Sequence, residues 1–281
     1  MSARFTDRFG KGFVAALAVL ALIAGLALIA PLLSPYACDE IDFDGVWSAA
    51  PGFARAHWFG TDSLGRDLFA RSFCGGRLSL SVGLVSTLVS LVIGVAWGAI
   101  AGFRGGKLDA FMMRSVDVLY ALPFMFLVIV LMVLFGRQPL LMFVAIGAVN
   151  WLDMARVVRG QTLALKHREF IDAARVTGLT DTQILWRHIV PNLASVVAVY
   201  AALTVPQVIL IESFLSFLGL GVREPATSWG ALINDGAREM ESAPWSLIFP
   251  ALLLAVTLFC LNVVGDGLRR VFDPRSVEPR A

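Results

Sequence analysis

Residues 13–33 read FVAALAVLALIAGLALIAPLL, an apolar run without a single charged side chain. An α-helix needs about 20 mostly apolar residues to cross the hydrocarbon core of a bilayer. Arg4, Arg8 and Lys11 precede the run, as in a secretory signal, but the run is too long for one and no small-residue cleavage pattern closes it. The stretch therefore predicts a retained transmembrane helix and an integral membrane protein.

Five further apolar runs follow along the chain. Apolar residues make up 58% of the sequence and charged residues only 16%, which is too little charge for the surface of a soluble domain of this length. We therefore predict an all-α, polytopic transmembrane bundle of six spans. Their ranges are 13–33, 78–101, 118–135, 138–152, 193–211 and 244–265.

The distribution of basic residues predicts the orientation. If the N-terminus is cytoplasmic and six spans alternate, 16 of the 23 Lys and Arg residues fall on the inner side. The positive-inside rule favours this arrangement, with both termini in the cytoplasm. It places the long segments 34–77 and 220–243 outside and 156–192 inside. We divide the chain into an N-terminal span and outer loop (1–77), a core (78–270) and a cytoplasmic tail (271–281).

The inner segment carries the strongest local pattern. Glu169-Phe170-Ile171-Asp172-Ala173-Ala174-Arg175-Val176-Thr177-Gly178 reads as a short helix that ends at a glycine able to adopt a left-handed turn. Thr180 and Gln183 have capping-box spacing for a second helix, and Pro191 marks the start of the fifth span. Ala173 and Ala174 are small enough for another surface to approach closely. A docking element and a plain surface hairpin are both compatible with this pattern.

Segment 160–191 resembles the coupling loop of ABC importer permeases, whose pattern is Glu-Ala-Ala, three residues, Gly, nine residues and Ile-x-Leu-Pro. Asp172 stands at the Glu position, and Ala173, Ala174, Gly178 and Pro191 match at the same spacing. His188 and Val190 replace the Ile and Leu. The resemblance implies that this loop, with Glu169 and Asp172 beside the alanines, contacts an ATPase subunit.

Other stretches resemble the peptide and nickel branch of the family, and within it the oligopeptide permeases. They are residues 57–67, 75–80, 151–163, 187–192, 213–221, 228–230, 262–269 and 273–274. The resemblance implies a type I ABC importer permease fold in a bacterial inner membrane. Dipeptides, glutathione and nickel stay open as alternative substrates, because their permeases share these stretches.

The resemblance also implies the partners. The chain has no phosphate-binding G-x-x-x-x-G-K-[ST] loop, so ATP and Mg²⁺ are expected on two separate ATPase subunits and no cofactor on this chain. A second homologous permease, a periplasmic binding protein, the peptide and membrane lipid complete the expected assembly. No nucleic-acid pattern, metal-ligand spacing or catalytic set is present, so neither a metal site nor enzyme activity is expected. A secondary transporter is the remote alternative.

Three further features give candidate sites. In the outer loop, Gly60 and Gly65 permit tight turns, and Arg66 stands between the carboxylates of Asp62 and Asp67. We expect Asp62 or Ser63 to cap a following helix, and Arg66 to hold the turn through both carboxylates. The loop is either a rigid fold or a contact for the binding protein.

Glu212 is the most unusual carboxylate, because apolar residues continue beyond it to Val222. It either lines a substrate pathway and binds a peptide amine, or forms an interhelical bond. Cys38 and Cys74 lie in the same outer loop, so a disulfide can form there if that compartment is oxidising.

Overall fold

The computed structural model describes residues 10–43, 47–52, 57–135 and 139–272, and these residues are mainly helical. The segment between the first two helices is held by isolated bridges such as Ile41–Arg66 and Thr61–Asp67. The helices are α2 (Lys11–Leu33), α3 (Leu68–Arg104), α4 (Gly106–Tyr120), α5 (Phe124–Phe135), α6 (Pro139–Leu165), α7 (Glu169–Val176), α8 (Asp181–Ile184), α9 (Val190–Asn192), α10 (Ala194–Phe217), α11 (Trp229–Arg238) and α12 (Trp245–Phe272), with a π-helical turn, η2, at Leu185–Ile189.

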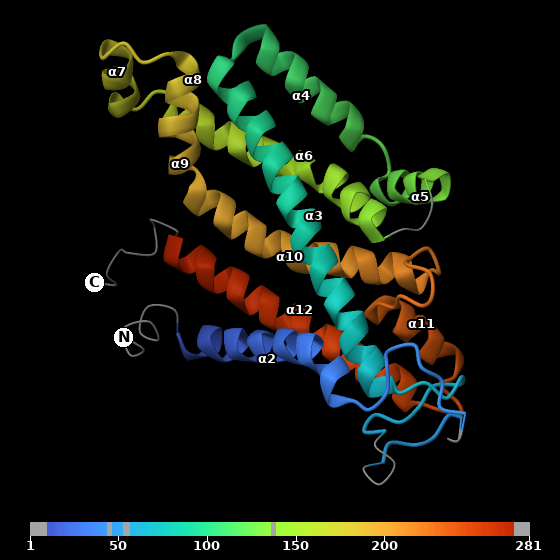
Figure 1. The fold of residues 1–281 in the computed structure, drawn as a ribbon. Helices are drawn as coiled ribbons and strands as arrows, with labels where there is room; N and C mark the ends of the chain where they lie inside the picture. Colours follow the sequence, from blue (N-terminus) through green and yellow to red (C-terminus); the bar gives the residue numbers. More distant parts are fainter. Residues whose placement is uncertain (1–9, 44–46, 53–56, 136–138, 273–281) are drawn as a thin grey trace.

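The long helices form one bundle with two distinct ends (Figure 1). α2, α12 and α10 lie side by side, and α3 crosses them and packs most extensively against α6. The short helices α7, α8 and α9 lie at the end where α10 begins and α12 finishes, which we call the hairpin end. α11 and the loop before α3 lie at the opposite end, the loop end. The predicted topology requires the hairpin and the loop to lie on opposite sides of the membrane, and therefore at opposite ends of the bundle.

Within the residues that the structure describes, four helices are long and apolar enough to cross a membrane. They are α2, α3, α10 and α12, which match the first, second, fifth and sixth predicted spans. α6 contains the described part of the fourth predicted span but continues to Leu165, and its second half carries Asp153, Arg156 and Arg159. The all-α membrane bundle is confirmed, and the structure is consistent with six spans.

The third predicted span is wrong as a single helix. The run 118–135 is divided between the end of α4 at Tyr120 and the start of α5 at Phe124. Pro123 explains the break, because proline has no backbone N–H and disfavours helical geometry at the residue before it. α5 has only 12 residues, about 18 Å of helix, which is shorter than the hydrocarbon core.

Glycine allows α3 and α6 to approach closely. Gly94, Gly98 and Gly102 are four residues apart, so they lie on one face of α3. A methyl group at Gly94 would lie 2.6 Å from Met154 Cβ, and one at Gly98 would overlap the carbonyl oxygen of Ala155. Small residues at this spacing are the usual means of bringing membrane helices together, where lipid supplies no hydrophobic drive.

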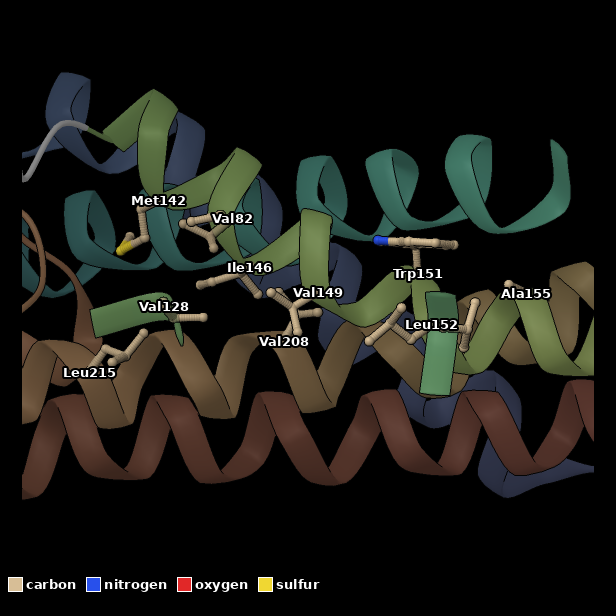
Figure 2. Close-up of a cluster of buried hydrophobic side chains, with 12 residues drawn as sticks. Val82, Val128, Met142, Ile146, Val149, Trp151, Leu152, Ala155, Val208 and Leu215 are labelled. Atoms are coloured by element: carbon tan, nitrogen blue, oxygen red, sulfur yellow. The ribbon is translucent and has the colours of Figure 1, made fainter. Parts of the chain in front are cut away.

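The largest apolar cluster fills the space between α3, α6 and α10. Val82, Ile146 and Val208 are fully buried in one layer of it (Figure 2). Val128 contributes from α5, so the short helix is anchored to the bundle by its own buried side chain. Two serine hydroxyls of α3 also bond to α6, including Ser90 Oγ, which donates to the Gly147 carbonyl at 2.9 Å.

Candidate functional site

The hairpin of α7 and α8 is built around the turn at Gly178. Gly178 has φ +85°, the left-handed region that glycine adopts without strain. Its N–H donates to the Arg175 carbonyl at 3.0 Å, and the Leu179 N–H donates to the Ala174 carbonyl at 3.2 Å. These two bonds form a Schellman motif. The predicted glycine turn is therefore present.

The second helix of the hairpin starts with the predicted capping box. Thr180 accepts a hydrogen bond from the Gln183 N–H, and the Gln183 side chain accepts one from the Thr180 N–H at 2.9 Å. Two N–H groups that a helix start leaves free are satisfied in this way. The cap and the Schellman turn are separated only by Leu179, so together they fix the angle between α7 and α8.

The two alanines of the coupling pattern lie on different faces of α7, one exposed and one buried. Ala174 is buried at 7% exposure with Ile171, in a cluster that also contains Ile184 and Leu185. Only Ala173 is exposed. The structure therefore divides the alanine pair, because successive helical residues are 100° apart: Ala173 is open to a docking contact, and Ala174 packs on this chain's own hairpin.

The outward face of α7 is partly apolar. Phe170 is 41% exposed and Val176 is 88% exposed, with Ala173 between them at helical spacing. Asp172 and Arg175 border this face and form an ion pair of 2.8 Å. Glu169 is exposed in the first turn of α7. We call Phe170, Ala173 and Val176 the outer face of the hairpin.

A π-helical turn connects the hairpin to the bundle. In η2 the Val190 N–H donates to the Leu185 carbonyl, one residue further back than in an α-helix. Pro191 follows directly, and α10 begins at Ala194. Pro191 therefore stands just before the fifth span, as predicted. Single π turns of this kind are frequent at functional sites.

At the loop end, Arg66 binds two carboxylates. Arg66 Nε donates to Asp62 Oδ2 at 2.8 Å, and Nη1 donates to Glu224 Oε1 at 2.8 Å. Asp62 Oδ1 also accepts the N–H groups of Leu64 and Arg66, so one carboxylate closes the turn around Gly65, where φ is +77°. The guanidinium of Arg66 holds the pKa of Glu224 below its ordinary value.

Asp67 has a different role from the predicted one. Its Oδ2 accepts the Ala70 N–H at 2.8 Å and caps α3, so the prediction that Asp62 or Ser63 forms this cap is wrong. Its Oδ1 lies 2.9 Å from Nδ1 of the buried His57. The predicted bond from Arg66 to Asp67 is replaced by the one to Glu224, a residue that is distant in the sequence. Gly60 packs under the Trp245 indole.

Removing the Arg66 side chain should lower the amount of folded protein in the membrane. Arg66→Ala removes the closer of the two guanidinium groups that pair with the Asp62 carboxylate and leaves only Arg71 Nε, at 3.4 Å, which should cost about 2 kcal/mol. Quantitative blotting of the membrane fraction measures this loss. Arg223→Ala is the matched control, because Arg223 is exposed in the same region. Equal abundance of the two variants would contradict the predicted role.

The same contact has a pH dependence. Since the pKa of Glu224 is lowered in the folded protein, the stability that the ion pair adds is complete above the ordinary value of 4.5. It is lost as the pH falls through the lowered pKa. The loop should therefore keep this contact across the neutral range and lose it only in strong acid.

Two more contacts fix the loop to the bundle. Cys38 and Cys74 form a disulfide that ties the loop to the first turns of α3, with a Cα–Cα distance of 6.4 Å. Trp229, the first residue of α11, is fully buried and donates from Nε1 to the Ser72 carbonyl at 2.9 Å. The loop, α11 and the start of α3 therefore form one packed unit.

Glu212 lies inside the bundle and is fully buried. Its carboxylate accepts hydrogen bonds from Ser79 Oγ of α3 at 2.8 Å and from Ser216 Oγ at 2.7 Å. Ser79 Oγ in turn accepts the Trp229 N–H of α11. This geometry matches the interhelical alternative, since an enclosed carboxylate cannot touch a peptide in this conformation.

Comparison with known proteins is consistent with this architecture. Residues 94–278 match the family described as binding-protein-dependent transport system inner membrane component, and residues 10–51 match the N-terminal TM domain of oligopeptide transport permease C. The chain is 56% identical to the oligopeptide transport system permease protein OppC of Escherichia coli K12, over 95% of this chain and 88% of the relative.

Two other relatives show the same relationship. OppC of Haemophilus influenzae is 52% identical over 95% of this chain and 85% of its own length. The dipeptide transport system permease protein DppC of Bacillus subtilis is 42% identical over 93% of this chain and 81% of its own length. With its apolar helices, its hairpin and these matches, the chain belongs to the family of binding-protein-dependent transport system inner membrane components, the permeases of ABC importers.

Proposed function

We propose that this chain is one of two permease subunits that carry oligopeptides across the cytoplasmic membrane, driven by two separate ATPase subunits and supplied by a periplasmic binding protein. The α7–α8 hairpin is the observation that carries the proposal. It stands at one end of the bundle, its turn and cap are fixed by backbone bonds, and its outer face is exposed and partly apolar. A rigid, exposed hairpin of this kind suits docking into a groove of another protein.

The membrane orientation is part of the proposal. We place the hairpin end and both termini in the cytoplasm, and the loop end in the periplasm. The bias of Lys and Arg supports this, and so does the disulfide between Cys38 and Cys74, because disulfides persist in oxidising compartments.

Reporter fusions test the orientation. A periplasm-active reporter fused after Glu40 or Glu239 should be active, and one fused after Lys166 should be silent. A cytoplasm-active reporter should give the opposite pattern. Activity of the periplasmic reporter at Lys166 would place the hairpin outside and remove the docking argument.

Uptake measurements test the transport activity itself. Cells that lack the gene for this chain should fail to accumulate a radiolabelled tripeptide, and the intact gene should restore uptake. Uptake should stop when the partner ATPase carries a mutated phosphate-binding loop. Uptake that continues without ATPase activity would favour a secondary transporter.

Crosslinking tests the docking face. A cysteine at the exposed Ala173 should crosslink to an ATPase subunit that carries cysteines along its groove. A cysteine at Ala174 is the matched control and should not crosslink, because this position is buried in the hairpin. Crosslinks from both positions, or from neither, would contradict the proposed geometry.

Dipeptide transport is the second candidate, because the DppC relative is 42% identical, as is OppC of the same Bacillus strain. Competition decides between them. A tripeptide or longer peptide should compete with the labelled substrate more strongly than a dipeptide if oligopeptides are the substrate.

A further inference from the structure

Two neighbouring cavities open on the face of α6 and α10 that the chain leaves uncovered. The larger, of about 460 Å³, lies against the break between α4 and α5 and is lined by Leu119–Pro123 together with Val149 and Ile211. The second, of about 270 Å³, lies along Tyr200, Thr204 and Gln207 of α10. Asn150 and Asp153 of α6 line both, so the two form one groove. Its size is in the range of ligand sites.

The polar side chains of this groove lie at membrane depth. Thr204 and Gln207 are near the middle of the 24-residue α10, which is one of the four apolar spans. With Tyr200 they form a polar stripe at helical spacing. Asn150 and Asp153 of α6 line the same cavity as Thr204 and Gln207, so they lie at a similar depth. Polar groups at this depth are costly against lipid and normally face a water-filled pathway or another protein.

The charges of the groove leave one carboxylate without a partner. Arg156 is its only cationic lining residue among those the structure describes, and Arg156 Nη2 bonds to Asp117 Oδ1 at 2.9 Å. The Arg156 guanidinium also lies 4.2 Å from the centre of the Tyr120 ring. Asp153 is exposed and has no hydrogen bond or ion pair with any described residue. Of the two charged lining residues, Arg156 is therefore paired outside the groove, and the Asp153 carboxylate is available to a ligand.

We infer that this groove is the chain's part of the translocation pathway, and that the Asp153 carboxylate binds the protonated amine of the passing peptide. The inference rests on the proposed function. The apolar cavity beside the α4–α5 break accepts apolar side chains of the peptide. Asn150 Oδ1 and Gln207 offer hydrogen-bond partners to its backbone, because among the described residues Asn150 uses only its amide nitrogen, which donates to the Ile146 carbonyl.

The different surroundings of Glu212 and Asp153 explain why we give the two carboxylates different roles. Glu212 is enclosed by serine hydroxyls and joins three helices, whereas Asp153 lines a cavity and has no partner among the described residues. A carboxylate that binds a passing ligand must be accessible, as Asp153 is and Glu212 is not. A peptide can therefore bind Asp153 without breaking a bond between described residues of the fold.

Asp153→Asn in the complete importer tests the inference. Uptake of a labelled tripeptide with a free N-terminus should fall about tenfold or more, since a hydrogen bond to a charged group is lost. Asp153→Glu should retain most uptake. Asp266→Asn is the control, because Asp266 is an exposed carboxylate on a different long helix, away from the groove. Uptake by Asp153→Asn equal to that of the control would overturn the inference.

Photocrosslinking with the wild-type chain gives a second, independent measurement. A tripeptide with benzoylphenylalanine at its first position, loaded through the binding protein, should crosslink to residues 150–157 or 200–207 when ATP is present. Crosslinks that map only elsewhere would overturn the inference even if Asp153→Asn fails to assemble. If the wild-type importer shows no ATP-dependent uptake, the proposed function itself fails.

Discussion

Gly178→Val should lower ATP-driven peptide uptake roughly tenfold while the amount of protein in the membrane stays near normal. Valine is strained in the left-handed region by roughly 1–2 kcal/mol, and a difference of about 1.4 kcal/mol changes the population of the correct turn tenfold. The apolar spans are untouched, so insertion should continue. The defect should be weaker association with the ATPase, measured by co-purification from membranes.

Substitutions at Gly178 that differ in size and backbone preference distinguish two causes of the defect: strain of the left-handed turn and steric blocking at the interface with the ATPase. A methyl at Gly178 meets no described atom within 4 Å, so side-chain size is not limited by this chain. Gly178→Asn should therefore transport well, because asparagine tolerates the left-handed conformation, and Gly178→Ala should be intermediate. If Gly178→Asn lowers uptake as much as Gly178→Val, the cause is steric blocking in the groove of the ATPase and not strain of the turn. Normal transport by Gly178→Val would contradict the coupling function of the hairpin.

Gly98→Leu should nearly eliminate folded protein. The first carbon of the new side chain already overlaps the Ala155 carbonyl, and Val158 Cβ lies 2.9 Å from it. α3 and α6 must then separate along their whole contact, including the hydrogen bond from Ser90 to Gly147. We expect a loss of about 3 kcal/mol or more, the upper part of the range for overpacked cores. Thermal melting in detergent, followed by size-exclusion chromatography, measures it.

Gly160→Ala is the matched control for this second variant. Gly160 lies in α6 between one and two turns after Ala155, which Gly98 contacts, and an added methyl meets no described atom within 4 Å. Alanine also favours helix over glycine, so this variant should be as stable as the wild type or slightly more stable. Comparable losses in the two variants would show that α6 tolerates no substitution and that close packing is not the cause.

Features encoded by neighbouring residues were predictable from the sequence. The apolar runs give α2, α10 and α12, and the spacing of Thr180 and Gln183 gives the capping box. The left-handed turn at Gly178 follows from glycine and its position at the end of a helical pattern. Each depends on bonds within a few residues, so a short window contains the needed information.

Features that depend on packing were not predictable in this way. Arg66 has carboxylates on both sides in the sequence, but its second partner is Glu224, more than 150 residues away. The alanine pair does not indicate which face of α7 is buried, and the structure turns Ala174 inward. The spacing of Gly94, Gly98 and Gly102 was a readable signal for close helix packing. Asp153 becomes distinctive only when the groove around it is known.

The length of α3 has a mechanical consequence. Its 37 residues span about 55 Å, more than the hydrocarbon core of a bilayer. Its first turns are tied to the loop by the disulfide at Cys74, and near its last turns Phe103 packs in the same cluster as Ile184 of the hairpin. A continuous helix is stiff along its axis. A displacement imposed on the loop end would therefore reach the hairpin end through this one helix, without a relay of separate rearrangements.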